Sequence, residues 1–552
     1  MFCYQCEQTA GGKGCDQMGV CGKDAMTSDL QDLLLYLTKG ISQYAYRAAE
    51  LGARDVGVDR YVVENLFTTI TNVNFDPVRL QNIVDQGLVM RDRAKSVYEE
   101  AAKKAGKSPE SLSGPAMFIP ARDEKGIDEQ AAEFGVVGRM TRMGADASGV
   151  FEIGIYGLKG LAAYSDHARV LGQESPEVYK EFHRLLDYYA SEDHDLGSLL
   201  GTALEVGALN LKVMELLDIA NTSTYGHPVP TKVRTTPLKG KAILVSGHDL
   251  KDLAMLLEQT ANKGINIYTH GEMLPCHGYP ELKKYPHLVG NFGGAWQDQQ
   301  KEFDEFPGAI LMTTNCIQKP RETYKARIFT TSLVAWPNVV HVGENGEEKD
   351  FSQVIEAALE APGFAEDAPE AYTMTGFGHN AVLGAAETVV DLIKRGKIRH
   401  FLLVGGCDGA KSGRNYYTEI ATQAPDDVVI LTLACGKYRF NKLEFGDIEG
   451  LPRMLDMGQC NDTYSAIRVA VALADAFETD VNSLPLSLVL SWYEQKAVAV
   501  LLTLLHLGIR NIRIGPNLPA FVSPAALQIL HEKFNLMPIT TAEEDLKSIL
   551  GN

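Results

Sequence analysis

The chain has 552 residues, too many for one hydrophobic core, so we expect three domains. It carries 52 Lys and Arg against 71 Asp and Glu, a net charge of −19, which argues against nucleic acid or an anionic membrane as partner. Its longest apolar stretch, residues 497–508, is shorter than the roughly 20 residues of a spanning helix, so we expect no membrane segment. The beginning of the chain lacks the charge and apolar pattern of an export signal, and we expect a cytoplasmic protein.

Four cysteines lie in a glycine-rich loop at the start of the chain. Cys3, Cys6, Cys15 and Cys21 have the spacing Cys-x2-Cys-x8-Cys-x5-Cys. In a cytoplasmic chain, clustered cysteines indicate metal or redox ligands better than disulfides. Four thiolates suit an iron–sulfur cluster or a structural zinc, and free thiols are a third interpretation. The spacing therefore predicts a metal site without selecting the metal.

The next 200 residues have helical periodicity and contain an internal repeat. Residues 35–52 recur as residues 155–172, with seven of 18 positions identical. Each copy is followed by two further helical stretches, 59–71 and 76–106 in the first copy and 177–191 and 197–219 in the second. We therefore predict a helical domain over residues 1–225, built from two three-helix bundles.

The rest of the chain alternates short apolar runs with helix-length segments. Such runs predict parallel strands, here over 242–245, 265–268, 309–314, 401–404, 428–434, 486–490 and 509–514. A break rich in proline and glycine near residue 362 divides this region. We predict two Rossmann-like α/β domains with mainly parallel sheets, 226–362 and 363–552.

Metal-ligating residue types follow several of these strands, namely His248, Glu272, Cys316, Cys407 and Cys435. Parallel sheets bind ligands beyond the carboxyl ends of their strands. A single histidine or glutamate in such a place is more often a hydrogen-bonded structural residue. Five in the same setting indicate a set of soft and hard ligands, which suits iron bridged by both sulfide and oxygen.

Seven motifs after the cysteine loop carry a family resemblance. They are SGHD at 246–249, THGEMLP at 269–275, TNC at 314–316, GGCDG at 405–409, ACGKY at 434–438, GQCND at 458–462 and WYEQK at 492–496. In this order they resemble the hybrid cluster protein family, also called prismane proteins or hydroxylamine reductases, over essentially the whole chain. The short cysteine spacing is similar to the class typical of anaerobes, whose first cluster is a [4Fe-4S] cubane.

The resemblance implies two cofactors. Cys3, Cys6, Cys15 and Cys21 would hold the [4Fe-4S] cluster. A hybrid cluster of [4Fe-2O-2S] type at the domain interface would be held by His248, Glu272, Cys316, Cys407, Cys435, Cys460 and Glu494. In the family the cysteine matching Cys407 can be a persulfide. Lys496 would supply a proton or hold an anionic intermediate, and the alternative for this lysine is a surface ion pair.

The resemblance also implies the reaction. Hydroxylamine, two electrons and two protons would give ammonia and water, with Glu272, Glu494, Cys407 and Lys496 as the catalytic residues. The electrons would come from a ferredoxin-like protein or an NADH-dependent reductase. The alternatives are reduction of nitric oxide to nitrous oxide, or a protein that nitrosylates partner thiols or senses redox state.

Three further features have weaker interpretations. The sequence GFGHNA at 376–381 suggests a nicotinamide enzyme, but residues 371–375 before it are a poor strand. Cys276 is interpreted as an inert free thiol. His270 and His277 are candidate proton donors near the site.

Overall fold

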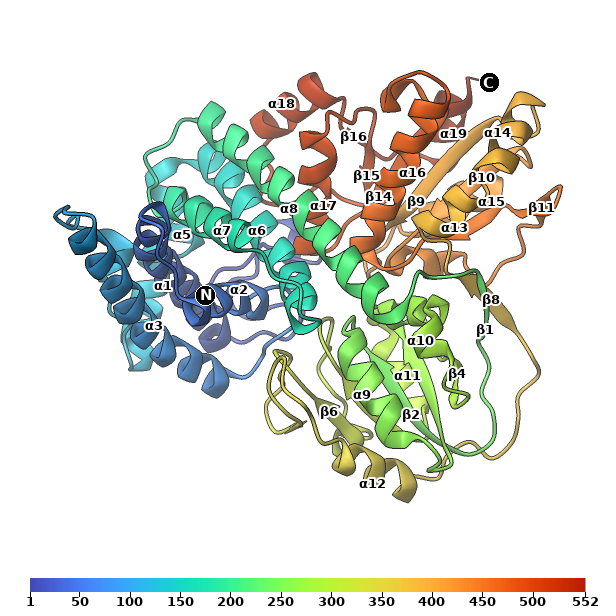
Figure 1. Ribbon diagram of the computed structural model, residues 1–552, viewed down its shortest axis with the longest axis horizontal. Coiled ribbons are helices and arrows are strands. Elements are labelled where there is room, and N and C mark those ends of the chain that lie inside the picture. Colours follow the sequence, from blue (N-terminus) through green and yellow to red (C-terminus); the bar gives the residue numbers. More distant parts are fainter. Residues whose placement is uncertain (552) are drawn as a thin grey trace.

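The computed structural model describes residues 1–551 as a helical region followed by two α/β regions (Figure 1). The first 225 residues hold α1 to α8, and each later region contains a six-stranded sheet. The predicted fold class is therefore confirmed. In Figure 1 the long helix α8 runs from the helical region toward the place where the two α/β regions meet.

The helical region repeats a long, a short and a long helix. The elements are α1 (Ala25–Glu50), α2 (Val56–Thr68), α3 (Pro77–Lys104), α4 (Glu124–Phe134), α5 (Val136–Met143), α6 (Ala145–Val170), α7 (Pro176–Tyr188) and α8 (Leu196–Tyr225). N-cap side chains determine where several of these helices begin. For example, Asp76 and Ser175 accept hydrogen bonds from backbone N–H groups in the first turns of α3 and α7. The sequence did not predict α4 and α5, which separate the two copies.

The first α/β region has the strand order β4-β3-β2-β5-β6-β7, and all neighbours are parallel. Its elements are β2 (Lys241–Ser246), α9 (Leu250–Thr260), β3 (Ile265–His270), α10 (Pro280–Lys283), β4 (Leu288–Asn291), α11 (Gln299–Glu305), β5 (Ala309–Met312), β6 (Ile328–Thr330), β7 (Val340–His341) and α12 (Ser352–Glu360). Alternate residues of β2 enter two separate apolar clusters, Ile243 in one and Leu244 in the other. Both faces are therefore buried, which explains the continuous apolar run.

The second α/β region has the order β13-β10-β9-β14-β15-β16, again all parallel. Its elements are α13 (His379–Gly384), α14 (Ala386–Lys394), β9 (His400–Gly406), α15 (Asn415–Gln423), β10 (Val428–Thr432), β11 (Asp447–Ile448), β12 (Leu451–Pro452), β13 (Met454–Asp456), α16 (Thr463–Ala476), β14 (Leu486–Ser491), α17 (Gln495–His506), β15 (Arg513–Gly515), α18 (Pro524–Phe534), β16 (Met537–Pro538) and α19 (Ala542–Leu550). The predicted strand 509–514 was wrong in extent, since β15 begins only at Arg513.

Counted in chain order within each sheet, both sheets have the order 3-2-1-4-5-6 of Rossmann folds. In this order the crevice opens beyond the carboxyl ends of the first and fourth strands. These strands are β2 and β5 in the first sheet and β9 and β14 in the second. The topology therefore marks one place in each sheet for a site.

The helical region packs closely on the second sheet. A Cβ on Gly160 of α6 would lie 2.2 Å from the Gln495 carbonyl oxygen at the start of α17, and one on Gly207 of α8 would lie 2.1 Å from that of Leu502. One apolar cluster runs from α1 through α8 to β9 and α17. Helix α17 is therefore packed closely on α6 at its start and on α8 further along.

The two α/β regions also share a small ladder. Strand β1 (Thr231–Arg234) pairs antiparallel with β8 (Tyr372–Thr375). The description of residues 371–375 as a poor strand was therefore wrong, but β8 lies outside both parallel sheets and does not form a nucleotide-binding unit with the glycines after it. The division into three domains stays a prediction, since this ladder crosses the proposed boundary.

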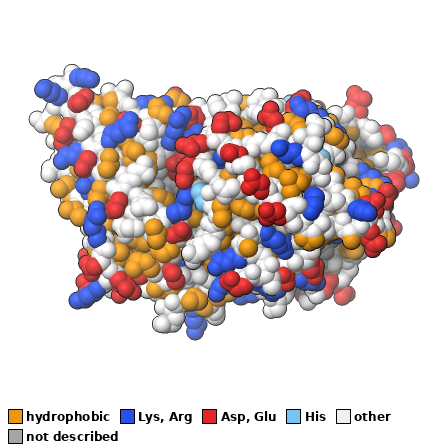
Figure 2. Space-filling view, turned by 90° about the horizontal axis from the view of Figure 1, so that it is seen from below, with side chains coloured by type: hydrophobic (Ala, Val, Ile, Leu, Met, Phe, Trp, Pro, Cys, Tyr) orange, Lys and Arg blue, Asp and Glu red, His pale blue; other side chains and the backbone are white. Residues whose placement is uncertain are grey.

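Two surface properties are plain. Acidic and basic side chains are interspersed on the face in Figure 2, so no patch of one sign dominates it. Among residues 1–551, no helix has both the length and the apolar character to cross a bilayer.

Candidate metal centre

The cysteine loop folds back on itself. Cys3 and Cys15 exchange two backbone hydrogen bonds of 2.9 and 2.8 Å. Burial, together with Cys3 and Cys21 close by, raises the pKa of Cys6. Four thiols held in one folded loop suit an iron–sulfur cluster or a structural zinc.

The strand ends bring a second set of side chains to one buried cavity. It is lined by His248, Glu272, Cys316, Cys407, Cys435, Glu494 and Lys496, among others. Cys460, which follows β13, lies beside it, because its sulfur and ligand atoms of His248 and Glu272 all lie within 4.8 Å of one another. All seven predicted hybrid-cluster ligands are thus gathered from two sheets.

Hydrogen bonds across the sheets hold this arrangement. The Cys460 N–H donates to Glu272 Oε2 at 2.9 Å, and His248 Nε2 lies 3.3 Å from the same oxygen. The Gln459 side-chain amide donates to the carbonyl oxygens of His248 (3.2 Å) and Glu272 (2.7 Å). Residues of the second sheet therefore set the position of candidate ligands from the first.

Lys496 is 1% exposed, so its interpretation as a surface ion pair was wrong. Its Nζ donates to His248 Nε2 at 3.0 Å and to Asn315 Oδ1 at 2.9 Å, and lies 3.7 Å from Glu494 Oε1. Burial opposes the charge, but the carboxylates of Glu494 and Glu272 outweigh it and raise the pKa of Lys496. The lysine is therefore a fixed cation in the cavity wall.

The His248 imidazole has the protonation state that a metal ligand requires. Burial and the Lys496 ammonium lower its pKa, so the ring is neutral. Because Nε2 accepts from Lys496, the ring proton is on Nδ1, which faces Thr314 Oγ1 at 2.9 Å. A metal would take the Nε2 lone pair that here accepts the hydrogen bond from Lys496, and a neutral ring is the form that binds a metal.

The charge balance of the cavity fits a metal cluster. Burial raises the pKa of Cys407 to about 12 and the pKa values of Cys316, Cys435 and Cys460 well above the ordinary range. These thiols need a bound cation to become thiolates. Four sulfurs, one nitrogen and two carboxylates form the mixed donor set that iron bridged by sulfide and oxygen accepts.

Aromatic residues lie between the two cysteine groups. The rings of Trp296 and Tyr493 stack with centroids 4.3 Å apart, and both pack with Cys6, Cys407 and Cys435. No sequence signal pointed to Trp296. Tyr493, Gln459 and Asn315 stand inside the quoted motifs, but their roles depend on partners far away in the chain.

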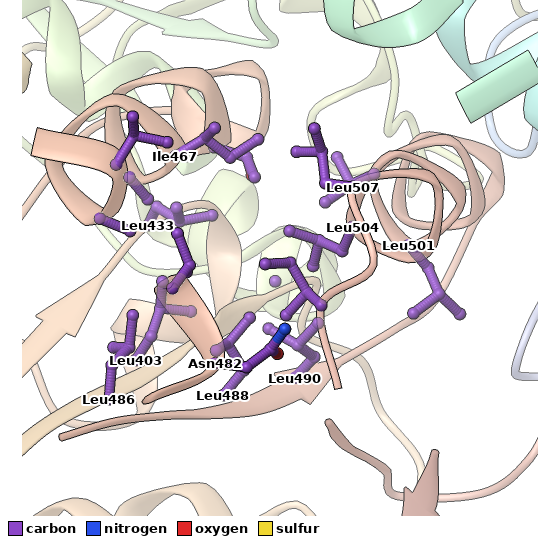
Figure 3. A pocket seen from close by; sticks show the side chains of 18 of the residues that line it. Leu403, Leu433, Ile467, Asn482, Leu486, Leu488, Leu490, Leu501, Leu504 and Leu507 are labelled. Atoms are coloured by element: carbon purple, nitrogen blue, oxygen red, sulfur yellow. The ribbon is translucent and has the colours of Figure 1, made fainter. Parts of the chain in front are cut away.

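An apolar cavity of about 420 Å³ reaches the same site from another side. Leucines of β14 and α17 line it, together with Leu433 and Ile467 (Figure 3). Its lining includes Cys407 and Cys460 at one end and Asn482 near the surface. A small uncharged molecule therefore has an apolar approach to the sulfur side of the site.

The sequence profile of the Prismane/CO dehydrogenase family matches residues 1–547. The chain belongs to this family. It is 58% identical to a hydroxylamine reductase of Geobacter sulfurreducens over 100% of both chains, and 57% identical to one of Solidesulfovibrio magneticus over 100% of both. One from Burkholderia lata is 56% identical over 100% of this chain and 99% of the relative. The resemblance predicted from the motifs is confirmed.

Solved structures show the same fold at low identity. Carbon monoxide dehydrogenase IV from Carboxydothermus hydrogenoformans has a TM-score of 0.57 and 16% identity, covering 97% of this chain and 89% of that one. The carbon monoxide dehydrogenase of Thermococcus sp. AM4 has a TM-score of 0.54 and 17% identity, covering 99% and 90%. Family membership and the two cysteine groups together support iron–sulfur clusters as the cofactors.

Two of the remaining candidates, Cys276 and His277, lie apart from the chemistry. Cys276 is fully buried in the apolar cluster beside the first sheet, as expected for an inert thiol. His277 accepts or donates one hydrogen bond with Thr269 Oγ1 at 3.1 Å, and burial lowers its pKa to about 4. It is therefore neutral and not a ready proton donor.

Proposed function

We propose that this protein is an iron–sulfur oxidoreductase that reduces hydroxylamine, with two electrons and two protons, to ammonia and water. The observation that carries the proposal is the meeting of seven ligand-type side chains and Lys496 at one buried cavity. The names of relatives at 56 to 58% identity support it.

Cys3, Cys6, Cys15 and Cys21 would hold a [4Fe-4S] cluster. His248, Glu272, Cys316, Cys407, Cys435, Cys460 and Glu494 would hold a hybrid cluster of [4Fe-2O-2S] type. When bound, these groups would supply single electrons and an iron site at which the N–O bond is reduced.

The protein's own residues would orient the substrate and move protons. The Lys496 ammonium faces the cavity as a hydrogen-bond donor and can stabilise negative charge that develops on the leaving oxygen. Glu272 and Glu494 would hold the cluster through carboxylates, which can bind a metal through one or two oxygens, and a change between the two would open a place for substrate. Trp296 and Tyr493 close the wall toward the cysteine loop and exclude water.

Electrons would enter at the cysteine loop, where Cys3 and Cys21 are only partly buried. A ferredoxin-like protein or an NADH-dependent reductase would deliver them. The stacked Trp296 and Tyr493 lie between this loop and the larger site, and would form the route between the two clusters.

Reduction of nitric oxide is a second candidate, favoured by the apolar cavity that reaches Cys407 and Cys460 (Figure 3). Two molecules of nitric oxide, two electrons and two protons would give nitrous oxide and water. Transfer of a nitrosyl group to partner proteins fits less well, because Cys407 is buried.

Steady-state assays with a chemically reduced dye test the proposal. The anaerobically purified protein should contain iron and sulfide, show paramagnetic resonance signals of two clusters, and form ammonia from hydroxylamine. Nitrous oxide formation from nitric oxide is measured in parallel. Absence of turnover on both substrates, with nitrosyl transfer to a partner thiol, would overturn the reductase assignment.

A further inference from the structure

Protons for the proposed reaction must reach a buried cavity, and a chain of three side chains leads to it. Ser246, the last residue of β2, lines the cavity. Its Oγ lies 2.9 Å from Nδ1 of His270, the last residue of β3. Nε2 of His270 in turn lies 2.9 Å from Oε2 of Glu302 on α11.

The two ends of this chain have different surroundings. His270 is 0% exposed, and its ring packs on Phe303 with centroids 5.0 Å apart. The Glu302 side chain is 17% exposed and so reaches solvent. Gly293, with φ of +81°, leaves room for the carboxylate, because a Cβ there would lie 2.6 Å from Oε2. The chain therefore connects solvent to the cavity through a segment closed to water.

We propose that Glu302, His270 and Ser246 form a proton relay from solvent to the metal cavity. The inference rests on the proposed function, which consumes two protons for each N–O bond broken. Glu302 takes a proton from hydronium in the solvent. It passes the proton to Nε2 of the His270 tautomer that carries its proton on Nδ1, and this Nδ1 proton moves to Ser246 Oγ. Ser246 gives its own hydroxyl proton to the substrate. Each group gains and loses one proton, and a return of the imidazole to its first tautomer completes the cycle.

A purely structural role is the competing explanation, since the same bonds tie β2, β3 and α11 together. Glu302→Gln separates the two roles. The amide keeps the length of the side chain and accepts from His270, but it does not carry a proton. Glu305→Gln on the same helix is the matched control, because Glu305 is exposed and has no ion-pair or hydrogen-bond partner in the described chain.

The test uses the intact holoenzyme with dye and hydroxylamine. For Glu302→Gln we expect kcat to fall about tenfold with unchanged KM, a larger solvent isotope effect, and partial rescue by added acetate. Proton uptake, followed with a pH indicator after rapid mixing of the reduced enzyme with hydroxylamine, should slow by the same factor. The resonance spectrum of the clusters should not change, and Glu305→Gln should match the wild type.

Three outcomes are separable. A wild-type enzyme that makes no ammonia contradicts the proposed function. A wild-type enzyme that turns over, with a Glu302→Gln variant equal to it in kcat and proton uptake, overturns the relay alone. Loss of stability or of cluster signals in Glu302→Gln, without acetate rescue, assigns the chain a structural role and also overturns the relay.

Discussion

The two α/β sheets have the same strand order but deliver different atoms to the shared cavity. Ligand-type residues follow the first, second and fourth strands of each sheet. The corresponding pairs are His248 and Cys407, Glu272 and Cys435, and Cys316 and Glu494. In both sheets a glycine with positive φ precedes the first member, Gly247 (+121°) and Gly406 (+104°).

The comparison shows that the place of a side chain at the cavity and its residue type are set independently. The repeated backbone design places three side chains from each sheet, whatever their type. The first sheet contributes nitrogen, oxygen and one sulfur, while the second contributes two sulfurs and an oxygen, with Cys460 added after its third strand. The mixed donor set thus follows from changing residue types on one repeated architecture.

We expect the largest effect when the sulfur that follows the first strand of the second sheet is removed. Cys407→Ala should lower the turnover of hydroxylamine about 100-fold or more and reduce iron content, because no nearby group replaces the lost ligand. Iron and sulfide per chain, with turnover, measure the effect. Cys276→Ala is the control, since it removes an equally buried thiol outside the cavity. Equal iron content in both variants would remove Cys407 from the ligand set.

Lys496 lies two places after Glu494. The corresponding position in the first sheet, two places after Cys316, is occupied by Gln318 and not by a lysine. Lys496→Gln should lower kcat about 10- to 100-fold, because the cavity loses a fixed cation and proton donor. Iron content should be retained. Lys411→Gln is a control for charge alone, since this lysine is only partly buried. A kcat like that of the wild type would show that Lys496 has no part in the chemistry.

Glu494 tests whether an oxygen after the fourth strand is a ligand. Glu494→Gln keeps the shape and a hydrogen-bond acceptor for the Lys496 N–H (2.9 Å in the wild type) but removes the carboxylate. We expect an altered resonance spectrum of the larger cluster and about tenfold lower turnover. An unchanged spectrum would falsify its assignment as a ligand.

The glycines test the shared architecture. A Cβ on Gly406 would lie 2.1 Å from the Ser491 carbonyl oxygen, and one on Gly247 would lie 2.3 Å from Thr313 Oγ1. Gly406→Ala and Gly247→Ala should each cost about 2 kcal/mol of unfolding free energy, seen as a Tm lowered by several degrees. Gly264→Ala, at φ of +69° in open space, should cost less. Equal losses in all three would attribute the effect to backbone strain and not to strand contact.

The sequence predicted the strands and the candidate ligands because both signals are local. An apolar run such as residues 428–434 can only be buried, and the glycine or polar residue that ends it marks where the chain leaves the sheet. The repeat at residues 35–52 and 155–172 predicted the helical bundles for the same reason. The ends of elements were less certain, as α8 and β15 show, because fraying and packing decide them.

The sequence by itself therefore determined the fold class, the family and the candidate ligands, since periodicity and motif spacing are properties of short segments. Only the tertiary structure decided that Lys496 is buried against His248, that Gln459 ties the two sheets together, and that Trp296 lies against Tyr493. These contacts join residues more than 190 positions apart, and they depend on how the sheets and helices pack. The common strand order of the two sheets, and hence the equivalent positions of their candidate ligands, became visible only in the tertiary structure.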